Sequence, residues 1–369
     1  MNLSILERPR KDGTTSFRAQ VRVFTGKKLT YSEAQTFDRR PAAETWLELR
    51  KKELSKPDAM KRVKNEDPPL GEIIDKYIGS HKKAIGKTKS QVLDTIKKYD
   101  IANMRGSMIL STHLTAFADE LAARGIQPQT VGNYLSHLSS VFKIAKPAWG
   151  YPLSYQEIQD ARLVAKHQGT VGRSKQRVRR PTLAELDRLL SHFAERERRD
   201  SRVIPMTLVT MFAIFSTRRQ EEICRIAIAD LDAQHSEILV RDLKHPGEKM
   251  GNDMRTTLPP EAMSIVNLQL AKPRVQQSGR IFPYSSDAIS RAFTDSCNLL
   301  GIEDLHFHDL RHDGISRLFE MGWQIPNVAM VSAHRTWTSL KRYTHIRHSG
   351  DKYHGWPWLG KLGISSEKA

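Results

Sequence analysis

Apolar and polar residues alternate near the start of the chain. Over residues 16–24 every second position is apolar, which is the period of a half-buried strand. Residues 29–37 are the expected returning strand, and a helix should open at Pro41 because proline suits the first turn of a helix. We predict a small unit of two or three strands and one helix over residues 1–56.

The pattern then changes to helical spacing. After a polar, proline-bounded stretch over 56–68, apolar residues recur three and four positions apart from Leu70 to about Lys166. This predicts a domain of four or five helices over residues 69–165. Residues 166–181 are basic and hold few apolar side chains, so we interpret them as a linker.

The last part of the chain, 182–369, mixes element types. Thr182 and Glu185 have the spacing of a capping box, which marks a helix start. The strongly apolar run over 205–215 predicts a buried helix. Two short strands and three further helices are expected at residues 237–240, 255–258, 286–300, 310–321 and 326–331. The predicted fold is therefore mainly α with small β-sheets (α+β).

Composition limits the class of protein. Of the 369 residues, 39% are hydrophobic, which is enough for a sizeable core. With only two cysteines, neither a disulfide framework nor a cysteine-rich zinc site is expected. No stretch reaches the ~18 apolar residues of a membrane helix, and the N-terminus lacks the apolar run of a secretion signal. We expect a cytoplasmic protein with no membrane partner.

Charge narrows the class of partner. The formal net charge is +18 and basic residues occur in clusters, which favours nucleic acid over a charge that only keeps the protein soluble. Arginines on the outward face of the first strand suit a DNA groove, although a solvated basic face is the alternative. The basic linker suits phosphate contacts. The predicted DNA-binding residues are Arg18, Arg22, Lys175, Arg177, Arg179 and Arg180.

Three segments place charged and titratable side chains in apolar surroundings. In the first, STRRQEEI (216–223), Arg219 and Glu222 are three apart and share a helix face. A carboxylate there can hold a guanidinium in a fixed pose. Taken alone, a plain surface salt bridge explains the pair as well.

The second and third segments are rich in histidine. In HDLRH (308–312), His308 and Arg311 share a helix face, and a metal site or an N-cap with surface histidines is the alternative reading. The segment lacks the glutamate of a metalloprotease helix, so we predict no metal and no other cofactor. In the third segment, His334 and Tyr343 are nine residues apart, a spacing that is weak by itself.

Together these segments resemble the tyrosine recombinase (phage integrase) family. Its members typically read T-G-x-R-x-x-E-L, then H-D-L-R-H, then L-G-H followed by Y-T-H. This chain has STRRQEEI, HDLRH, and SAH leading to RYTH (333–345), in that order. The resemblance is strong over 182–348, moderate over 70–165 and weak over 1–55. Residues 306–320 look most like the shufflon-type and filamentous-phage integrase branch.

The segments also depart from the family pattern. Thr217 and Ala333 each stand where the family usually has glycine. Arg218 directly precedes Arg219 and is a rival for the role of the first arginine. We align Arg219 because it keeps the spacing to Glu222.

The resemblance implies a set of catalytic residues and their roles. The predicted set is Arg219, Lys244, His308, Arg311, His334 and Tyr343, with Glu222 in support. Tyr343 would attack a DNA phosphate to give a 3′-phosphotyrosine, with His308 as its base, and His334 would donate to a phosphoryl oxygen. Lys244, with Lys249 as a weaker rival, would protonate the departing 5′-oxygen. The two arginines can each donate two hydrogen bonds to the phosphate and so replace a metal ion.

The resemblance also implies partners and an arrangement of domains. The implied layout is an arm-type DNA-binding unit (1–56), a core-binding helical domain (69–165), a basic linker (166–181) and a catalytic domain with a tail (182–369). The implied partners are double-stranded attachment-site DNA and three further copies of the chain in a homotetramer. An accessory directionality factor or a host DNA-bending protein is a further expected partner, within the nucleoid of a bacterial host.

Alternatives to integration and excision of a mobile element remain open at this point. They are inversion or resolution by the same family, a type IB-like topoisomerase, and a DNA-binding regulator without catalysis. The tail after Tyr343 carries Tyr353, Trp356 and Trp358. We expect this tail to dock on a neighbouring protomer, with packing on its own domain as an equal alternative.

Overall fold

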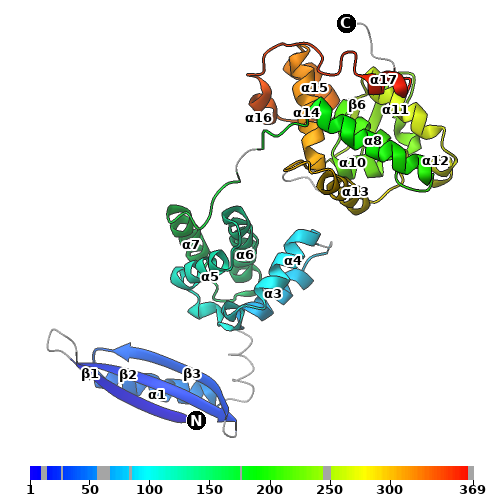
Figure 1. The fold of residues 1–369 in the computed structure, drawn as a ribbon. Coiled ribbons are helices and arrows are strands. Elements are labelled where there is room, and N and C mark those ends of the chain that lie inside the picture. Colours follow the sequence, from blue (N-terminus) through cyan, green and yellow to red (C-terminus); the bar gives the residue numbers. More distant parts are fainter. Residues whose placement is uncertain are drawn as a thin grey trace. The chain divides into compact units, whose positions relative to one another are not determined.

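The computed structural model describes residues 1–9, 15–25, 28–55, 67–82, 85–174, 177–243 and 251–364. The chain divides into two compact units, Met1–Lys175 and Gln176–Ala369, and each is described by itself (Figure 1). No helix in the described part is long and apolar enough to cross a membrane.

The first element group is a three-stranded antiparallel sheet with one helix. Its elements are β1 (Asn2–Pro9), β2 (Thr15–Thr25), β3 (Lys28–Phe37) and α1 (Arg40–Leu54), with strand order β1-β2-β3. Ala19 and Val21 are fully buried beneath the helix residues Ala43 and Leu47. The predicted alternation is therefore confirmed, and β1 supplies a third strand ahead of it. Arg22 is exposed, as expected for the opposite face of β2.

The same unit continues as a helical domain. Its helices are α3 (Leu70–Gly79), α4 (Lys87–Ile96), η1 (Asp100–Asn103), η2 (Gly106–Met108), α5 (Ser111–Ala123), α6 (Pro128–Trp149) and α7 (Tyr155–His167). The apolar positions at helical spacing form one core, as predicted. The packing continues past residue 165 because Val171 contacts this core and the Gly172 N–H donates to the Pro128 carbonyl. The first residues assigned to the linker thus belong to the helical domain.

The second unit carries the three motif segments. Its elements are α8 (Leu183–Arg199), α9 (Met206–Phe215), α10 (Gln220–Arg225), η3 (Ile228–Asp230), β4 (Leu231–Asp232), β5 (Glu237–Val240), β6 (Met254–Thr257), α11 (Pro260–Leu270), α12 (Pro273–Ser278), α13 (Ser286–Leu299), α14 (Phe307–Glu320), α15 (Ile325–Ser332), α16 (Trp337–Leu340), η4 (Lys341–Tyr343) and α17 (Pro357–Lys361). The fold is mainly helical with small antiparallel sheets, as predicted.

The apolar run before the first motif forms the central helix of this unit. All ten residues of α9 are buried, which explains why the run shows no polar face. The Thr182–Glu185 capping box is present at the start of α8. Helix α14 begins at Phe307, three residues earlier than predicted, because the Asp309 carboxylate accepts from the His306 N–H and caps the helix there.

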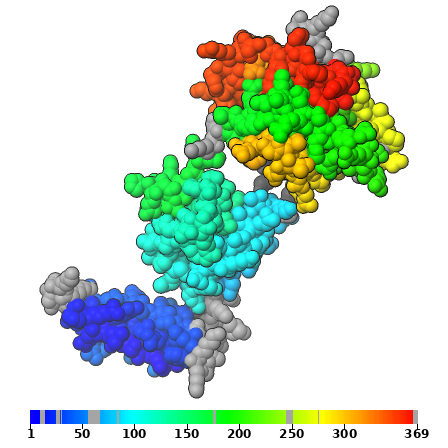
Figure 2. Space-filling view, in the orientation of Figure 1, coloured from blue at the N-terminus to red at the C-terminus, as the bar shows by residue number. Residues whose placement is uncertain are grey.

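The C-terminal tail packs on its own unit, the second of the two alternatives that the sequence left open. Tyr353, Trp356 and Trp358 are buried in the main core. The Trp356 indole N–H donates to Asp187 on α8 at 2.8 Å. The red C-terminal residues accordingly lie directly against green residues of the same unit (Figure 2). The apolar side chains of the described tail are therefore accounted for within one chain.

Candidate active site

The first motif occupies the turn between α9 and α10. The Ser216 hydroxyl donates to the Phe212 carbonyl at 2.5 Å as α9 ends. Thr217 then takes a φ of +55°, a left-handed conformation that reverses the chain and favours glycine. Arg219 follows at the N-cap position of α10. The left-handed backbone at this position explains why the family usually has glycine where this chain has Thr217.

The second motif lies on α14, which crosses α9 at close range. A Cβ atom on Gly314 would lie 2.0 Å from the Ile214 carbonyl oxygen, so only glycine allows this approach. The contact brings Arg311, three residues earlier on α14, to the turn at Thr217. Its guanidinium donates to the Thr217 carbonyl and, at 3.0 Å, to the Ser332 carbonyl. Arg311 therefore links the first motif to the third.

Arg218 makes a second link of the same kind. Its side chain is fully buried, and it donates to the Ser216 carbonyl at 3.1 Å and to the Val331 carbonyl. Burial lowers the pKa of Arg218 to about 10. Because this guanidinium is enclosed, Arg218 acts as a brace between the two turns, which the sequence did not reveal.

Arg219 has the opposite exposure. Its side chain is 30% exposed, and it donates to the Glu222 carboxylate at 2.7 Å. Glu222 also accepts from the Arg219 backbone N–H at 3.1 Å. Although burial alone would raise the pKa of Glu222, the guanidiniums of Arg218, Arg311 and Arg219 lower it. This geometry supports Arg219, rather than Arg218, as the arginine available to a substrate, with Glu222 in the predicted supporting position.

His334 completes the contact between the motifs. It follows Ala333, which has a φ of +55° where the family usually has glycine. The His334 Nε2 lies 3.3 Å from an Arg311 nitrogen, and its Nδ1 lies 2.7 Å from the Ser332 hydroxyl. Since a guanidinium only donates, Nε2 accepts and Nδ1 carries the proton. Burial and the charges of Arg311 and Arg219 lower the pKa of His334 to about 3, so the ring is neutral.

Tyr343 lies in η4 and is buried. Its ring stacks on Phe319 of α14, with centroids 6.0 Å apart and planes 10° apart. Its hydroxyl lies 2.5 Å from Nδ1 of His312. Burial raises the pKa of Tyr343, so the phenol is protonated in this state. The contact with His312 was not predicted, although His312 directly follows Arg311 in the second motif.

His308 lies one helical turn before His312. The two rings are perpendicular with centroids 4.9 Å apart, and His308 is the more exposed of the two. Partial burial and the charges of Arg311 and Arg219 lower the pKa of His308. Lys244 and its rival Lys249 lie outside the described residues. Among the residues that the structure does describe, no three histidine, cysteine or acidic side chains gather as metal ligands.

Residues 177–181 form a strap on the catalytic unit, in which the predicted DNA contacts Arg177, Arg179 and Arg180 pair with carboxylates of the same unit. Arg177 pairs with Asp309 and Asp304 at 2.8 Å each. Arg180 pairs with buried Asp313 at 2.7 Å. Arg179 pairs with Glu185, and Arg180 also pairs with Glu320. These partners occupy the guanidiniums, and most of them lie over 100 residues away in sequence. Lys175 lies outside the described residues.

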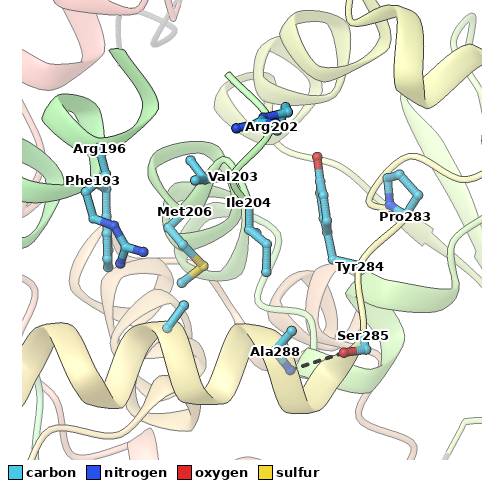
Figure 3. A pocket seen from close by; sticks show the side chains of 11 residues that line it. Phe193, Arg196, Arg202, Val203, Ile204, Met206, Pro283, Tyr284, Ser285 and Ala288 are labelled. Atoms are coloured by element: carbon cyan, nitrogen blue, oxygen red, sulfur yellow. Dashed lines mark hydrogen bonds between the residues drawn. The ribbon is translucent and has the colours of Figure 1, made fainter. Parts of the chain in front are cut away.

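A pocket of about 420 Å³ lies elsewhere in the catalytic unit. It is bounded by Phe193 of α8, the loop at Arg202–Ile204 and the start of α13, with Tyr284 at its edge (Figure 3). None of the described catalytic candidates lines it. The predicted chemistry is therefore concentrated at the junction of the three motifs and not in this hollow.

The junction combines charge with an enclosed nucleophile. Three guanidiniums, those of Arg218, Arg219 and Arg311, lie around a single carboxylate, Glu222. The excess positive charge is partly desolvated, and burial lowers the pKa of Arg311 to about 9. A bound anion would relieve this excess, and two of its oxygens could be held by planar guanidinium groups. The site is thus suited to an oxyanion such as a phosphodiester.

Comparisons with known proteins agree with this site. Residues 180–349 match the phage integrase family. A shufflon-specific DNA recombinase of Escherichia coli is 31% identical over 305 residues, which is 79% of this chain and 71% of that protein.

Solved structures show the same fold. A lambda integrase dimer bound to a core site has a TM-score of 0.54 and 18% identity, covering 92% of this chain and 94% of that one. The Tn1549 transposon integrase, in complex with a circular intermediate DNA, has a TM-score of 0.57 and 14% identity, covering 74% and 94%. The chain belongs to the phage integrase family of tyrosine site-specific recombinases.

Proposed function

We propose that this recombinase integrates and excises a mobile element, such as a prophage, through a 3′-phosphotyrosine intermediate on Tyr343. The observation that carries the proposal is the proximity of Arg219, Arg311 and His334, which come from three distant motifs. Tyr343 contacts His312 of α14, the helix that also carries Arg311. A non-enzymatic DNA-binding regulator has no use for such an assembly.

The proposed reaction exchanges one phosphoester for another. The Tyr343 oxygen attacks the phosphorus, the bond to the 5′-oxygen breaks, and a 5′-hydroxyl leaves. Arg219 and Arg311 stabilise the charge that develops on the non-bridging oxygens, and each such donor is commonly worth about 3–4 kcal/mol. Lys244 supplies the proton to the leaving oxygen. The 5′-hydroxyl of a partner strand then reverses the exchange, so neither a metal ion nor ATP is consumed.

We propose double-stranded attachment-site DNA as the substrate and a homotetramer as the active assembly. The lambda integrase is described as a tetramer bound to a Holliday junction, and that structure has a TM-score of 0.57 to this chain. Arg18 and Arg22, on the β2 face away from Ala19 and Val21, are the proposed contacts of the N-terminal unit. An accessory directionality factor or a host DNA-bending protein would set the direction.

The first experiment is covalent trapping. The protein is incubated with a nicked attachment-site duplex, or with pooled host and element DNA, in EDTA. A detergent-resistant adduct is expected with the wild type and with the control Tyr155→Phe, whose tyrosine lies on the helical domain. The adduct should vanish in Tyr343→Phe. An adduct that persists in Tyr343→Phe would place the nucleophile elsewhere, and tight binding without any adduct would favour a regulator.

A second candidate is inversion by the same chemistry. The observation that favours it is the 31% identity to a shufflon-specific recombinase. Plasmids that carry two sites in direct or inverted orientation separate these outcomes. Excision of the interval between direct sites supports the first proposal, and efficient inversion alone supports the second. Relaxation of supercoils without a partner site would indicate a topoisomerase.

A further inference from the structure

We propose that His312 accepts the proton of the Tyr343 hydroxyl during strand cleavage and returns it during rejoining. This inference rests on the proposed function and adds a catalytic residue to it. The resemblance to the family gives the role of base to His308, one turn earlier on the same helix. The geometry around the nucleophile points to His312 instead.

The contact between His312 and the nucleophile is direct. The distance from His312 Nδ1 to the Tyr343 hydroxyl oxygen is 2.5 Å, so the two groups are in direct hydrogen-bond contact. Both partners are held in place. His312 projects from α14, and the Tyr343 ring is fixed by stacking on Phe319 and by the Arg342 guanidinium 5.3 Å from its centroid.

The direction of this hydrogen bond follows from the surroundings of His312. The ring is half-buried, and the groups that face it are His308, Asp309 and Arg311 of α14 and Arg342 of η4. Burial, His308 and the two arginines keep the imidazole neutral near neutral pH, and only Asp309 acts the other way. A neutral imidazole has one acceptor nitrogen. Because the phenol is protonated, its O–H donates and Nδ1 accepts.

The same surroundings explain why the transfer waits for DNA. Without a phosphate, moving the proton would create an imidazolium beside Arg311 and Arg342, which is unfavourable. An incoming phosphodiester contributes negative charge at those arginines. The proton then moves from the Tyr343 oxygen to His312 Nδ1 as the O–P bond forms and the bond to the 5′-oxygen breaks. In rejoining, the Tyr343 oxygen is the leaving group and takes the proton back.

His308 is placed for a different contact. Its ring is more exposed than that of His312 and meets it edge to face at 4.9 Å, so His308 lies on the solvent side of the pair. We therefore assign to His308 the contact with the incoming phosphate and to His312 the contact with the tyrosine oxygen. Of the two histidines, His312 is the less exposed and the one in contact with Tyr343.

The test is the pH profile of single-turnover cleavage. The substrate is a nicked duplex with a 5′-bridging phosphorothiolate, whose sulfur leaves without a proton, so that the leaving-group acid no longer matters. The wild type should be independent of pH between about 6 and 8. His312→Asn should be about 10²–10⁴-fold slower at neutral pH, and its rate should rise with pH because hydroxide must remove the proton. His306→Asn, at the exposed start of α14, should match the wild type.

Chemical rescue gives an independent readout. Added imidazole should accelerate His312→Ala at least about tenfold, because it can occupy the vacated space and accept the proton. It should not accelerate Tyr343→Phe. The proposal is overturned if His312→Asn keeps a wild-type rate and profile. It is also overturned if its profile stays flat while His308→Asn alone acquires a slope.

A measurement without DNA covers the case of a misfolded variant. The ¹⁵N resonance of His312 Nδ1 in the wild-type protein should shift in Tyr343→Phe, which removes the hydroxyl and keeps the ring. An unchanged resonance would contradict the hydrogen bond and with it the proposal. A wild type that forms no adduct with any DNA would instead contradict the proposed function, so the two failures are distinct.

Discussion

Two sets of arginines in the catalytic unit differ in what holds them. The strap set consists of Arg177, Arg179 and Arg180, and the site set of Arg218, Arg219 and Arg311. Every strap guanidinium meets at least one carboxylate. In the site set the two buried members are held by backbone carbonyl oxygens, and Glu222 is the single carboxylate that meets any of the three within the part of the chain that the structure describes.

The comparison shows how a fold can hold an arginine in place and still leave its positive charge available to bind an anion. A carboxylate orients an arginine and cancels its charge, whereas a carbonyl orients it and leaves the charge in place. The pKa values follow this division. Side-chain hydrogen bonds to Asp309 and Asp304 raise the pKa of Arg177. Burial and neighbouring arginines lower that of Arg311 to about 9. The charges of the strap set are thus paired with carboxylates, whereas most of the positive charge of the site set is left uncompensated.

The largest expected effect comes from changing the shape of a site cation while keeping its charge. Arg311→Lys retains one positive charge but loses the planar donors that reach the Thr217 and Ser332 carbonyls and a phosphate together. We expect adduct formation to fall about 10²–10³-fold. The measurement is the single-turnover cleavage rate at saturating DNA. A rate within threefold of wild type would contradict the comparison. The geometry in which the carbonyl oxygens hold the Arg311 guanidinium would then not matter for cleavage.

The next effect concerns the stability of the strap. Arg180→Ala leaves Asp313, which is fully buried, with Lys352 and Tyr353 as its remaining partners. We expect a loss of about 2–3 kcal/mol in unfolding free energy, below the ~3–5 kcal/mol of a fully broken buried pair because those partners remain. Thermal unfolding measures it.

The control for this stability effect is an exposed arginine. Arg199→Ala removes a surface pair with Glu195 and should cost at most about 1 kcal/mol. Equal losses of unfolding free energy in Arg180→Ala and Arg199→Ala would mean that burial of the Asp313 carboxylate does not make its pair stronger than a surface pair.

Sequence patterns predicted most of the fold because period and burial are local properties. The alternation in β2 and the apolar run of α9 each appeared as expected. The spacing of Arg219 to Glu222 also predicted their contact.

The contacts that sequence could not supply are those between distant segments. The carboxylates that hold Arg177 and Arg180 lie on α14 or just before it, over 120 residues away in sequence. The sequence therefore indicated only a basic linker. The approach of Gly314 to Ile214 and the hydrogen bond of His312 to Tyr343 likewise depend on helix crossings. The sequence showed that Thr217 and Ala333 stand where the family usually has glycine. Only the structure showed that both residues keep the left-handed backbone conformation.

A smaller effect is expected from acid. The Arg179 guanidinium lowers the pKa of Glu185 from 4.5 to about 2. Because the folded-state pKa lies below the unfolded value, the pair stabilises the fold fully above about pH 4.5, and this contribution is lost as the pH falls toward about 2. We expect about 1 kcal/mol, reduced by solvent screening at the partly exposed pair.

The melting temperature of wild type and Glu185→Gln between pH 7 and 3 measures this contribution. The wild type should be more stable at neutral pH, and the difference should shrink on acidification. Asp309 and Asp351, whose pKa values are also lowered, titrate in both proteins and cancel in the comparison. A difference that is constant with pH would show that the Glu185 carboxylate acts through packing and not through charge.

The smallest effect tests the turns that present the carbonyl acceptors. Ala333 has a φ of +55°, a left-handed conformation that costs an ordinary residue roughly 1–2 kcal/mol. Ala333→Gly removes this strain, but a more flexible unfolded chain offsets part of the gain by about 0.4–1 kcal/mol. We expect a net stabilisation of about 0.5 kcal/mol, seen as a small rise in melting temperature. Cleavage should stay near the wild-type rate, because the Ser332 carbonyl that holds Arg311 keeps its position.

The matched change Ala329→Gly, within α15, should instead destabilise by about 0.5–1 kcal/mol. If both variants lost stability equally, the left-handed turn would not be what orients the acceptors, and the arginines themselves would shape the backbone around them.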